Sequence, residues 1–254
     1  IETGVRSGNH CEGGDSDLTT FLEKNEPNFI FKGLNAATDM GCIIEKELPD
    51  IQAQPNIEEI SIIGRSGTLT EWYGDYKPYD LNVGAVTIPY ENLEDVKRWL
   101  SGSGKFISHN DLDKVIDAAP SFSSPLEFGN EWGVFYTFNL TFRCQPLKRK
   151  VNEQSIKLYS KNTLFNPGSE RSFPIFEVET SGGILKINCN DVILTVPSML
   201  DGAVKIDCEN GLVIQNDRQL RTVGEWPEIM PGENNVSITG GYSGAKILLR
   251  SAWT

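Results

Sequence analysis

The chain has 254 residues, of which 39% are hydrophobic, and it carries a formal net charge of -12. This composition is too apolar for a disordered chain and too polar for a membrane protein, and no stretch approaches the roughly 20 apolar residues of a membrane-spanning helix. Gripping nucleic acid requires Lys and Arg against the phosphates, so the acidic charge disfavours that role. An acidic wall would still let DNA slide past without sticking. At about 150 residues per domain, the length favours two domains.

The N-terminal segment is rich in Gly, Ser and Asp, does not begin with Met and lacks the apolar run of a signal peptide. We interpret residues 1–26 as an added leader or a disordered tail. The cysteines are odd in number, widely spread and without a C-x-x-C pair, so we expect reduced thiols rather than a disulfide scaffold. They are Cys11, Cys42, Cys144, Cys189 and Cys208.

The first half of the chain alternates short apolar runs with Gly and Pro, starting at Phe29. This pattern is typical of strands and hairpins, and the stretch EEISIIGRSGTLTEWYGDY shows it most clearly. One helix is predicted at about residues 91–101, where Leu93, Trp99 and Leu100 help to form one apolar face. The run VFYTFNLTF then alternates apolar and polar residues, which predicts a half-buried strand.

A change of composition after Pro146 marks the predicted domain boundary, near residues 147–162. Beyond it, strand-like runs alternate with turn signals every eight to twelve residues or so, the spacing of an all-β sandwich. Turn signals include Ser-Gly-Gly at 181–183 and Asn-Gly at 210–211. We therefore predict a mainly β protein, with domains at 27–150 and 151–254 and the one principal helix in the first.

Signals for catalysis are absent from the sequence. GRSGT and GYSGA only approach the G-x-S-x-G turn of a serine nucleophile, and SGSGKF lacks the spacing of a phosphate loop. Histidine occurs at His10 and His109 alone. The HNDLD segment around His109 could offer oxygen ligands, but its ligand set is incomplete, and we interpret it as a solvated turn. We predict no enzyme activity, no cofactor and no metal.

Two aromatic clusters favour a binding surface. The first, EWYGDY, places Trp72, Tyr73 and Tyr76 on a hairpin-like segment, and the second places Trp226 and Met230 between prolines. Exposed aromatics on a sheet are typical of a sugar platform or a protein interface. Core packing is the alternative for each of them.

The order of these features resembles the distal tail protein (Dit) family of long, non-contractile-tailed phages and prophages of Gram-positive hosts. The resemblance lies in FIFKGLNAATDMGCII, ISIIGRSGTLTEWYGDYKPYDLNV, ENLEDVKRWLSGSGKFISHNDLDKVIDA and FYTFNLTFRCQPLKR in the first half. In the second half it lies in FNPGSERSFPIFEVE, ILKINCN and MPGENNVSI. It implies an N-terminal, β-sandwich or barrel-like, ring-forming domain and a C-terminal galectin-like β-sandwich that projects outward. The long insertion of larger relatives, which could add a carbohydrate-binding module, is missing.

The resemblance implies a hexameric ring at the tail tip, assembled in the host cytoplasm. This hub would join the tail tube protein to the tail-tip or baseplate proteins, with DNA only transiting its channel and no membrane partner. We predict that residues 68–79 contact the neighbouring subunit, because exposed strand edges pair readily and aromatics dominate interface energetics. The predicted anchors are Leu69, Trp72 and Tyr73.

A carbohydrate-binding module that contributes to host adsorption is the alternative function. The second half offers few aromatics for a sugar platform, so we expect weak glycan binding at most, with Trp226 as the residue to test. A cell-wall glycosidase or peptidase is a third reading, and no motif supports it.

Overall fold

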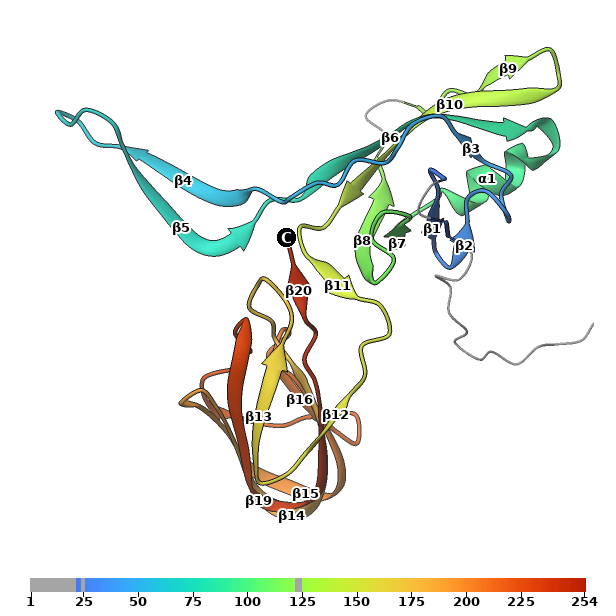
Figure 1. Ribbon diagram of the computed structural model, residues 1–254. Helices are drawn as coiled ribbons and strands as arrows, with labels where there is room; N and C mark the ends of the chain where they lie inside the picture. The colour runs from blue at the N-terminus through green and yellow to red at the C-terminus, as the bar shows by residue number, and fades with distance from the viewer. Residues whose placement is uncertain (1–21, 24–25, 122–124) are drawn as a thin grey trace, which may run out of the picture.

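The computed structural model describes residues 22–23, 26–121 and 125–254, and within them three antiparallel sheets dominate. Figure 1 shows two strand-rich bodies and a hairpin that extends away from them. One α-helix occurs among the described residues, α1 (Leu93–Trp99), directly after a 3-10 turn at Tyr90–Asn92. The predicted mainly β fold and the principal helix are confirmed. The described part of the chain contains no helix that could cross a membrane.

The predicted leader lies mostly outside the described residues, as do His10 and Cys11. Leu22, Glu23 and Glu26 are described. The Leu22 side chain is buried in a small cluster with Ile30 and Ile107. The expectation that residues up to 26 take no part in the fold is therefore wrong at this position.

The first sheet has ten strands, in the order β2-β1-β7-β8-β10-β6-β3 with three short strands added at its sides. Its longest pairing joins β6 and β10 over their whole length, with a bulge at Leu140–Thr141. The strands are β1 (Phe29–Phe31), β2 (Leu34–Asn35), β3 (Ile43–Ile44), β6 (Tyr79–Pro89), β7 (Gly104–Ser108), β8 (Lys114–Pro120), β9 (Gly129–Glu131), β10 (Phe135–Cys144), β11 (Lys148–Lys150) and β20 (Ala252–Trp253).

Aromatic side chains fill the core under this sheet. Phe138, Leu140 and Phe142 of β10 are buried while Asn139 and Arg143 between and beside them are exposed, as the period of two predicts. Phe142 packs on Phe29, Phe31 and Phe106, with ring centroids 5.0 to 5.5 Å apart. The helix closes this core through Trp99, whose Nε1 donates a hydrogen bond to the carbonyl of Phe31 at 2.8 Å.

The HNDLD turn between β7 and β8 is solvated at Asn110 and Asp113, as the sequence interpretation predicts, but not at His109. The His109 side chain is fully buried. Its Nδ1 lies 3.1 Å from the carbonyl oxygen of Asn28 and its Nε2 lies 2.8 Å from the carboxylate of Glu47. Asn110 Nδ2 donates a hydrogen bond to the carbonyl of Leu48 at 2.6 Å. The turn therefore holds the long loop before the hairpin against the sheet, a structural role that a lone histidine often has.

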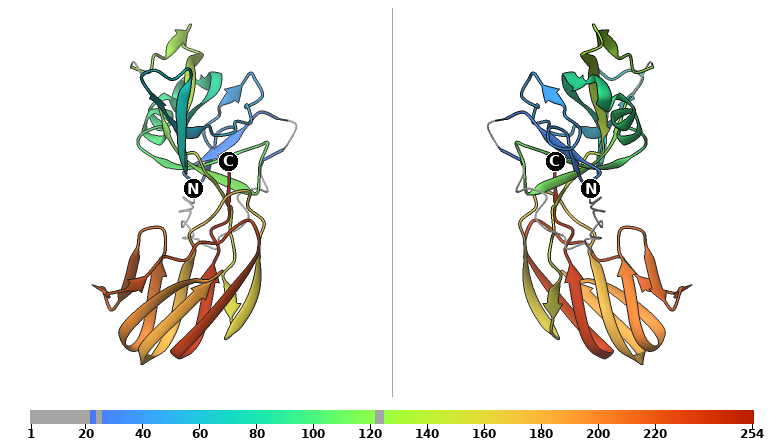
Figure 2. Two further views of the ribbon diagram at one scale, coloured as in Figure 1. Left: turned by 90° about the vertical axis from the view of Figure 1, so that its left-hand side faces the viewer. Right: turned by 90° about the vertical axis from the view of Figure 1, so that its right-hand side faces the viewer.

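The second sheet has eight strands, in the order β12-β19-β14-β15-β16-β17, with β13 on β19 and β18 on β15. Figure 2 shows this sheet curling on itself below the first body. Its strands are β12 (Ile156–Leu158), β13 (Lys161–Asn166), β14 (Ile175–Cys189), β15 (Val192–Asp207), β16 (Leu212–Gln215), β17 (Arg218–Gln219), β18 (Val223–Gly224) and β19 (Gly232–Leu248).

Two long strands of the second sheet run through glycine pairs that suggest turns in the sequence. Residues 181–183 lie inside β14, and a shift of register at Gly183–Leu185 replaces the predicted turn. The glycine pair at 240–241 lies inside β19 in the same way. These long strands serve both halves of the curled sheet, and their apolar side chains fill one core. The Asn210–Gly211 turn, by contrast, is present between β15 and β16.

The described cysteines are buried and carry free thiols. Burial raises the pKa of the Cys42, Cys144 and Cys208 thiols to about 12, and that of Cys189 to about 11. These thiols are protonated at neutral pH, and a protonated thiol is a poor nucleophile. They pack as small apolar side chains.

The two bodies are joined by two strands rather than by one linker. β11 pairs with β8 of the first sheet and with β20, which returns from the second body at the C-terminus. Arg149 of β11 donates to the carbonyl of Arg250 at 2.6 Å and pairs with Glu209 at 3.1 Å. Arg250 also pairs with Glu209. The domain limits at 150 and 151 remain a prediction.

Close backbone approach makes glycine necessary at the bend of β19, and this is testable. A Cβ at Gly240 would lie 2.0 Å from the carbonyl oxygen of Ile184, and φ is +117°. At Gly202 φ is +121°, but nothing lies within 4 Å. Gly202→Ala is therefore expected to cost about 1 kcal/mol from backbone strain, and Gly240→Ala about 2 kcal/mol more. Urea unfolding measures both. Equal losses of unfolding free energy in the two variants would contradict the close approach of the Ile184 carbonyl to Gly240.

Candidate assembly surface

The third sheet is a two-stranded hairpin of β4 (Pro55–Ser61) and β5 (Thr68–Tyr76), here called the arm. Figure 1 shows the arm extending away from both bodies. Every residue of β4 is exposed. The predicted contact segment, residues 68–79, consists of β5 and the start of β6, so the structure places it along the arm.

The arm has apolar side chains on both of its faces. Side chains alternate along a strand, and directly paired residues share a face. Leu69 is paired with Ile60, and Tyr73 lies on the same face of β5; Trp72 is paired with Ile57 on the opposite face. The exposed fractions are 37% for Leu69, 49% for Trp72 and 71% for Tyr73. The structure thus places Leu69 and Tyr73 on one face of β5 and Trp72 on the other.

Hydrogen bonds fix the two polar aromatics of the arm. Trp72 Nε1 donates to the carbonyl of Asp75 at 2.8 Å, and its ring lies edge-on to Tyr76 with centroids 5.7 Å apart. The Tyr73 hydroxyl donates to Glu71 Oε2 at 2.7 Å, which raises the pKa of Tyr73. Both rings are held in place while much of their surface stays open, so a partner would order them at little entropic cost.

The base of the arm is attached to the second body. The Tyr76 hydroxyl donates to Glu170 Oε1 at 2.8 Å, and burial, together with this carboxylate, raises the pKa of Tyr76 to about 12. Arg171 Nη2 donates to the carbonyl of Tyr73 at 3.4 Å, and its Nη1 lies 3.3 Å from Glu228. The direction of the arm therefore depends on side chains from the segment before β14.

A second exposed apolar surface lies at the opposite end of the first body, where β6 leads into α1 and β9 into β10. We call it the far-end patch, and its residues are Tyr90, Trp132, Val134 and Phe135. Trp132 is 97% exposed and has a φ of +57° in the β9–β10 turn. The Tyr90 backbone N–H donates to the carbonyl of Val134 at 3.2 Å.

Sequence reasoning missed part of both surfaces. The run EEISIIG has the pattern of an ordinary strand, yet its isoleucines are exposed in the structure. They are Ile60, Ile62 and Ile63, and Ile57 just before the run is exposed as well. The signal was the succession of isoleucines beside two glycine turns. Trp132 lies in a turn just before the predicted VFYTFNLTF strand, and no pattern in the sequence pointed to its exposure. Trp226 is half-buried on the second core, so core packing is the correct interpretation there.

The described residues contain no group of three or more His, Cys, Asp or Glu side chains placed to hold a metal ion.

Comparison with known proteins points to one fold. No protein-family model matches the sequence, and no curated protein matches it. The fold matches the crystal structure of SPP1 Dit (gp 19.1) with a TM-score of 0.65 at 12% sequence identity, over 87% of this chain and 98% of that one. The chain has a Dit-like fold, as the sequence resemblance predicts. SPP1 Dit is described as a paradigm of the hub adsorption apparatus in phages that infect Gram-positive bacteria.

Removing the guanidinium at the base should loosen the arm. In Arg171→Ala the arm loses its contact at Tyr73, so backbone amides of residues 68–76 are expected to exchange up to about fivefold faster, as for a contact worth up to about 1 kcal/mol. Hydrogen exchange read by mass spectrometry measures this. Arg98→Ala, which breaks an exposed ion pair with Asp95 on α1, is the control. Identical exchange of the arm in the two variants would show that Arg171 does not hold it.

Proposed function

We propose that the chain is a non-catalytic structural protein of a phage tail tip. It forms a ring-shaped hub that joins the tail tube protein to the tail-tip or baseplate proteins, with a central channel for DNA. The observation that carries the proposal is the Dit-like fold over 87% of the chain. The protein would assemble in the host cytoplasm and reside in the virion.

The placement of two unlike apolar surfaces supports a ring. The arm and the far-end patch lie at opposite ends of the first body and differ in residues (Figure 1). A surface that binds a different surface on the next copy gives a head-to-tail contact, which closes into a ring when the rotation permits. Six copies is the number that the resemblance implies.

Because the arm has apolar side chains on both faces, we expect the neighbouring subunit to cover it from both sides. Leu69 and Tyr73 would face one part of the neighbour and Trp72 another. Because a two-stranded hairpin is marginal in water on its own, burial between two surfaces would stabilise it. Aromatic residues in fully desolvated pockets dominate interface energetics, which makes Trp72 and Tyr73 the expected anchors.

Charge and thiol chemistry agree with this role. The net charge of -12 would keep phosphates from sticking to a channel wall. The described cysteines are unpaired, which suits assembly in a reducing cytoplasm.

Charge placed on the arm should block assembly without unfolding the protein. Leu69→Asp combined with Trp72→Ala is expected to lower incorporation into phage particles by about tenfold or more, the effect of losing at least one interface anchor. The unfolding free energy of the isolated protein should fall by about 1–2 kcal/mol at most, since both side chains are partly exposed and the main loss is the Trp72 hydrogen bond to Asp75.

The matched control for the arm variant is Leu200→Asp. Leu200 is also an exposed leucine on a strand, but it belongs to β15 of the second sheet. It should be incorporated normally. If the arm variant is incorporated as well as the control, the arm is not an assembly surface and the proposal fails.

A further inference from the structure

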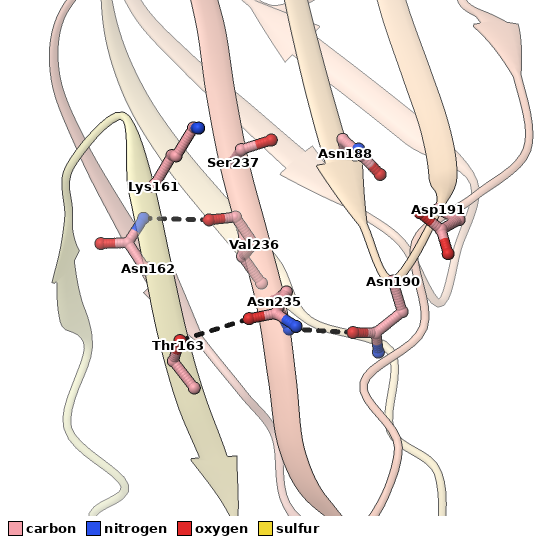
Figure 3. Close-up of a pocket in the computed structure, with 9 residues that line it drawn as sticks. All are labelled: Lys161, Asn162, Thr163, Asn188, Asn190, Asp191, Asn235, Val236 and Ser237. Atoms are coloured by element: carbon pink, nitrogen blue, oxygen red, sulfur yellow. Dashed lines mark hydrogen bonds between the residues drawn. The ribbon is translucent and has the colours of Figure 1, made fainter.

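A polar hollow of about 550 Å³ opens on the outer face of the second sheet. It lies where β13, β19 and the β14–β15 hairpin meet, as Figure 3 shows. Six side chains that line the hollow carry amide groups, hydroxyl groups, one positive charge and one negative charge. They are Lys161, Thr163, Asn188, Asp191, Asn235 and Ser237.

One wall of the hollow is a tight two-residue turn. Asn190 and Asp191 both have positive φ, +47° and +74°, the backbone of the compact hairpin turn that suits a twisted sheet. Asn190 Oδ1 accepts a hydrogen bond from the backbone N–H of Asn235 at 2.9 Å, and its Nδ2 donates to buried Asn234 at 2.6 Å. These bonds fix the turn against β19 and hold the Asp191 carboxylate at the rim.

The opposite wall is equally well fixed. Asn162 Nδ2 donates to the carbonyls of Tyr159 and Val236, which ties β13 to β19. The Thr163 hydroxyl donates to Asn235 Oδ1 at 3.2 Å, so the Asn235 amide is oriented (Figure 3). With its oxygen engaged, Asn235 keeps its Nδ2 donors for the hollow.

The floor carries an unused acceptor. Asn188 Oδ1 is buried and has no hydrogen-bond partner, which no other side-chain N or O atom among the described residues shares. Buried polar atoms are nearly always paired, because leaving one without a partner is unfavourable. A rotation of the Asn188 amide toward the hollow would bring this oxygen within reach of a hydroxyl donor seated there.

The chemistry of the lining matches a neutral sugar. Each sugar hydroxyl both donates and accepts, as amides and hydroxyls on the wall do. The charges of Lys161 and Asp191 offset each other, and the carboxylate would repel an anion. Two residues along the same face of β13 from Thr163, Phe165 is exposed, and Tyr159 is exposed just before the strand. Such rings offer apolar surface beside polar groups.

We propose that this hollow binds a neutral oligosaccharide weakly. This site goes beyond the scaffold role and does not include Trp226, the residue that the sequence analysis named for testing glycan binding, because Trp226 packs on the second core. Several copies held in one assembly would raise the avidity for a glycan-coated surface without any new contact. Binding by a single copy does not depend on the ring.

The test uses the isolated full chain, labelled with ¹⁵N. A panel of glucose, galactose, rhamnose, N-acetylglucosamine and their disaccharides is added at millimolar concentration, with glucuronate and inorganic phosphate as anionic probes. At least one neutral sugar is expected to shift the side-chain amide resonances of Asn188 and Asn235 with a millimolar Kd. No shift with any neutral sugar, or larger shifts with the anions, would overturn the proposal.

Variants separate this site from the rest of the surface. Asn235→Ala with Thr163→Val removes two hydrogen-bonding groups and is expected to weaken binding about tenfold. Lys161→Ala, an independent and exposed change, should weaken it too. Ser198→Ala, exposed on β15 outside the hollow, should bind normally. Equal affinity in all variants would place any binding elsewhere and contradict the inference. The arm variants should bind sugar unchanged, so failure here and failure of the scaffold role are distinguishable.

Discussion

A two-stranded hairpin cannot bury side chains on both of its faces, and this constraint governs the account of the protein. The arm carries Ile57 and Trp72 on one face and Ile60 and Leu69 on the other, with no third strand or layer over either. Single exposed apolar residues are ordinary, but a cluster of them on an isolated hairpin marks an interaction site. The proposed assembly would supply the cover that the arm lacks on each face.

Contacts at the base of the arm link the two bodies and set the direction of the arm. Tyr76 and the carbonyl of Tyr73 meet Glu170 and Arg171 of the second body, while β11 and β20 join the bodies behind it. The guanidinium of Arg149 is partly buried at this junction, and this burial lowers its pKa. Two strands and several charged contacts make the junction stiffer than a single linker would be. A rigid junction presents the arm at a defined angle, which a closed ring requires.

Local patterns in the sequence predict much of this fold. The alternation in β10, the apolar face of α1 and the Asn-Gly turn each depend on neighbouring residues, and all three are present in the structure. Glycine pairs misled the prediction because they occur both in turns and in bent strands. At Gly240 the bend is recognised from the Ile184 carbonyl of the neighbouring strand, which the local sequence does not reveal.

Features that depend on contacts distant in sequence could not be predicted. His109 is buried by residues about 62 and 81 positions away. The hollow combines β13, the β14–β15 turn and β19, and none of these segments carries a sugar-binding signal alone. For the arm, the sequence pointed to a segment that is exposed in the structure but not to the missing cover over both faces, and the role of its three anchors stays a prediction.

Electron cryo-microscopy of assembled tails tests the central claim most directly. The account predicts a closed ring of identical subunits at the tail tip, in which the arm of each copy lies against the far-end patch of the next, with the first bodies around the channel. A single copy per tail, or arms that point into solvent away from the tube axis, would contradict it.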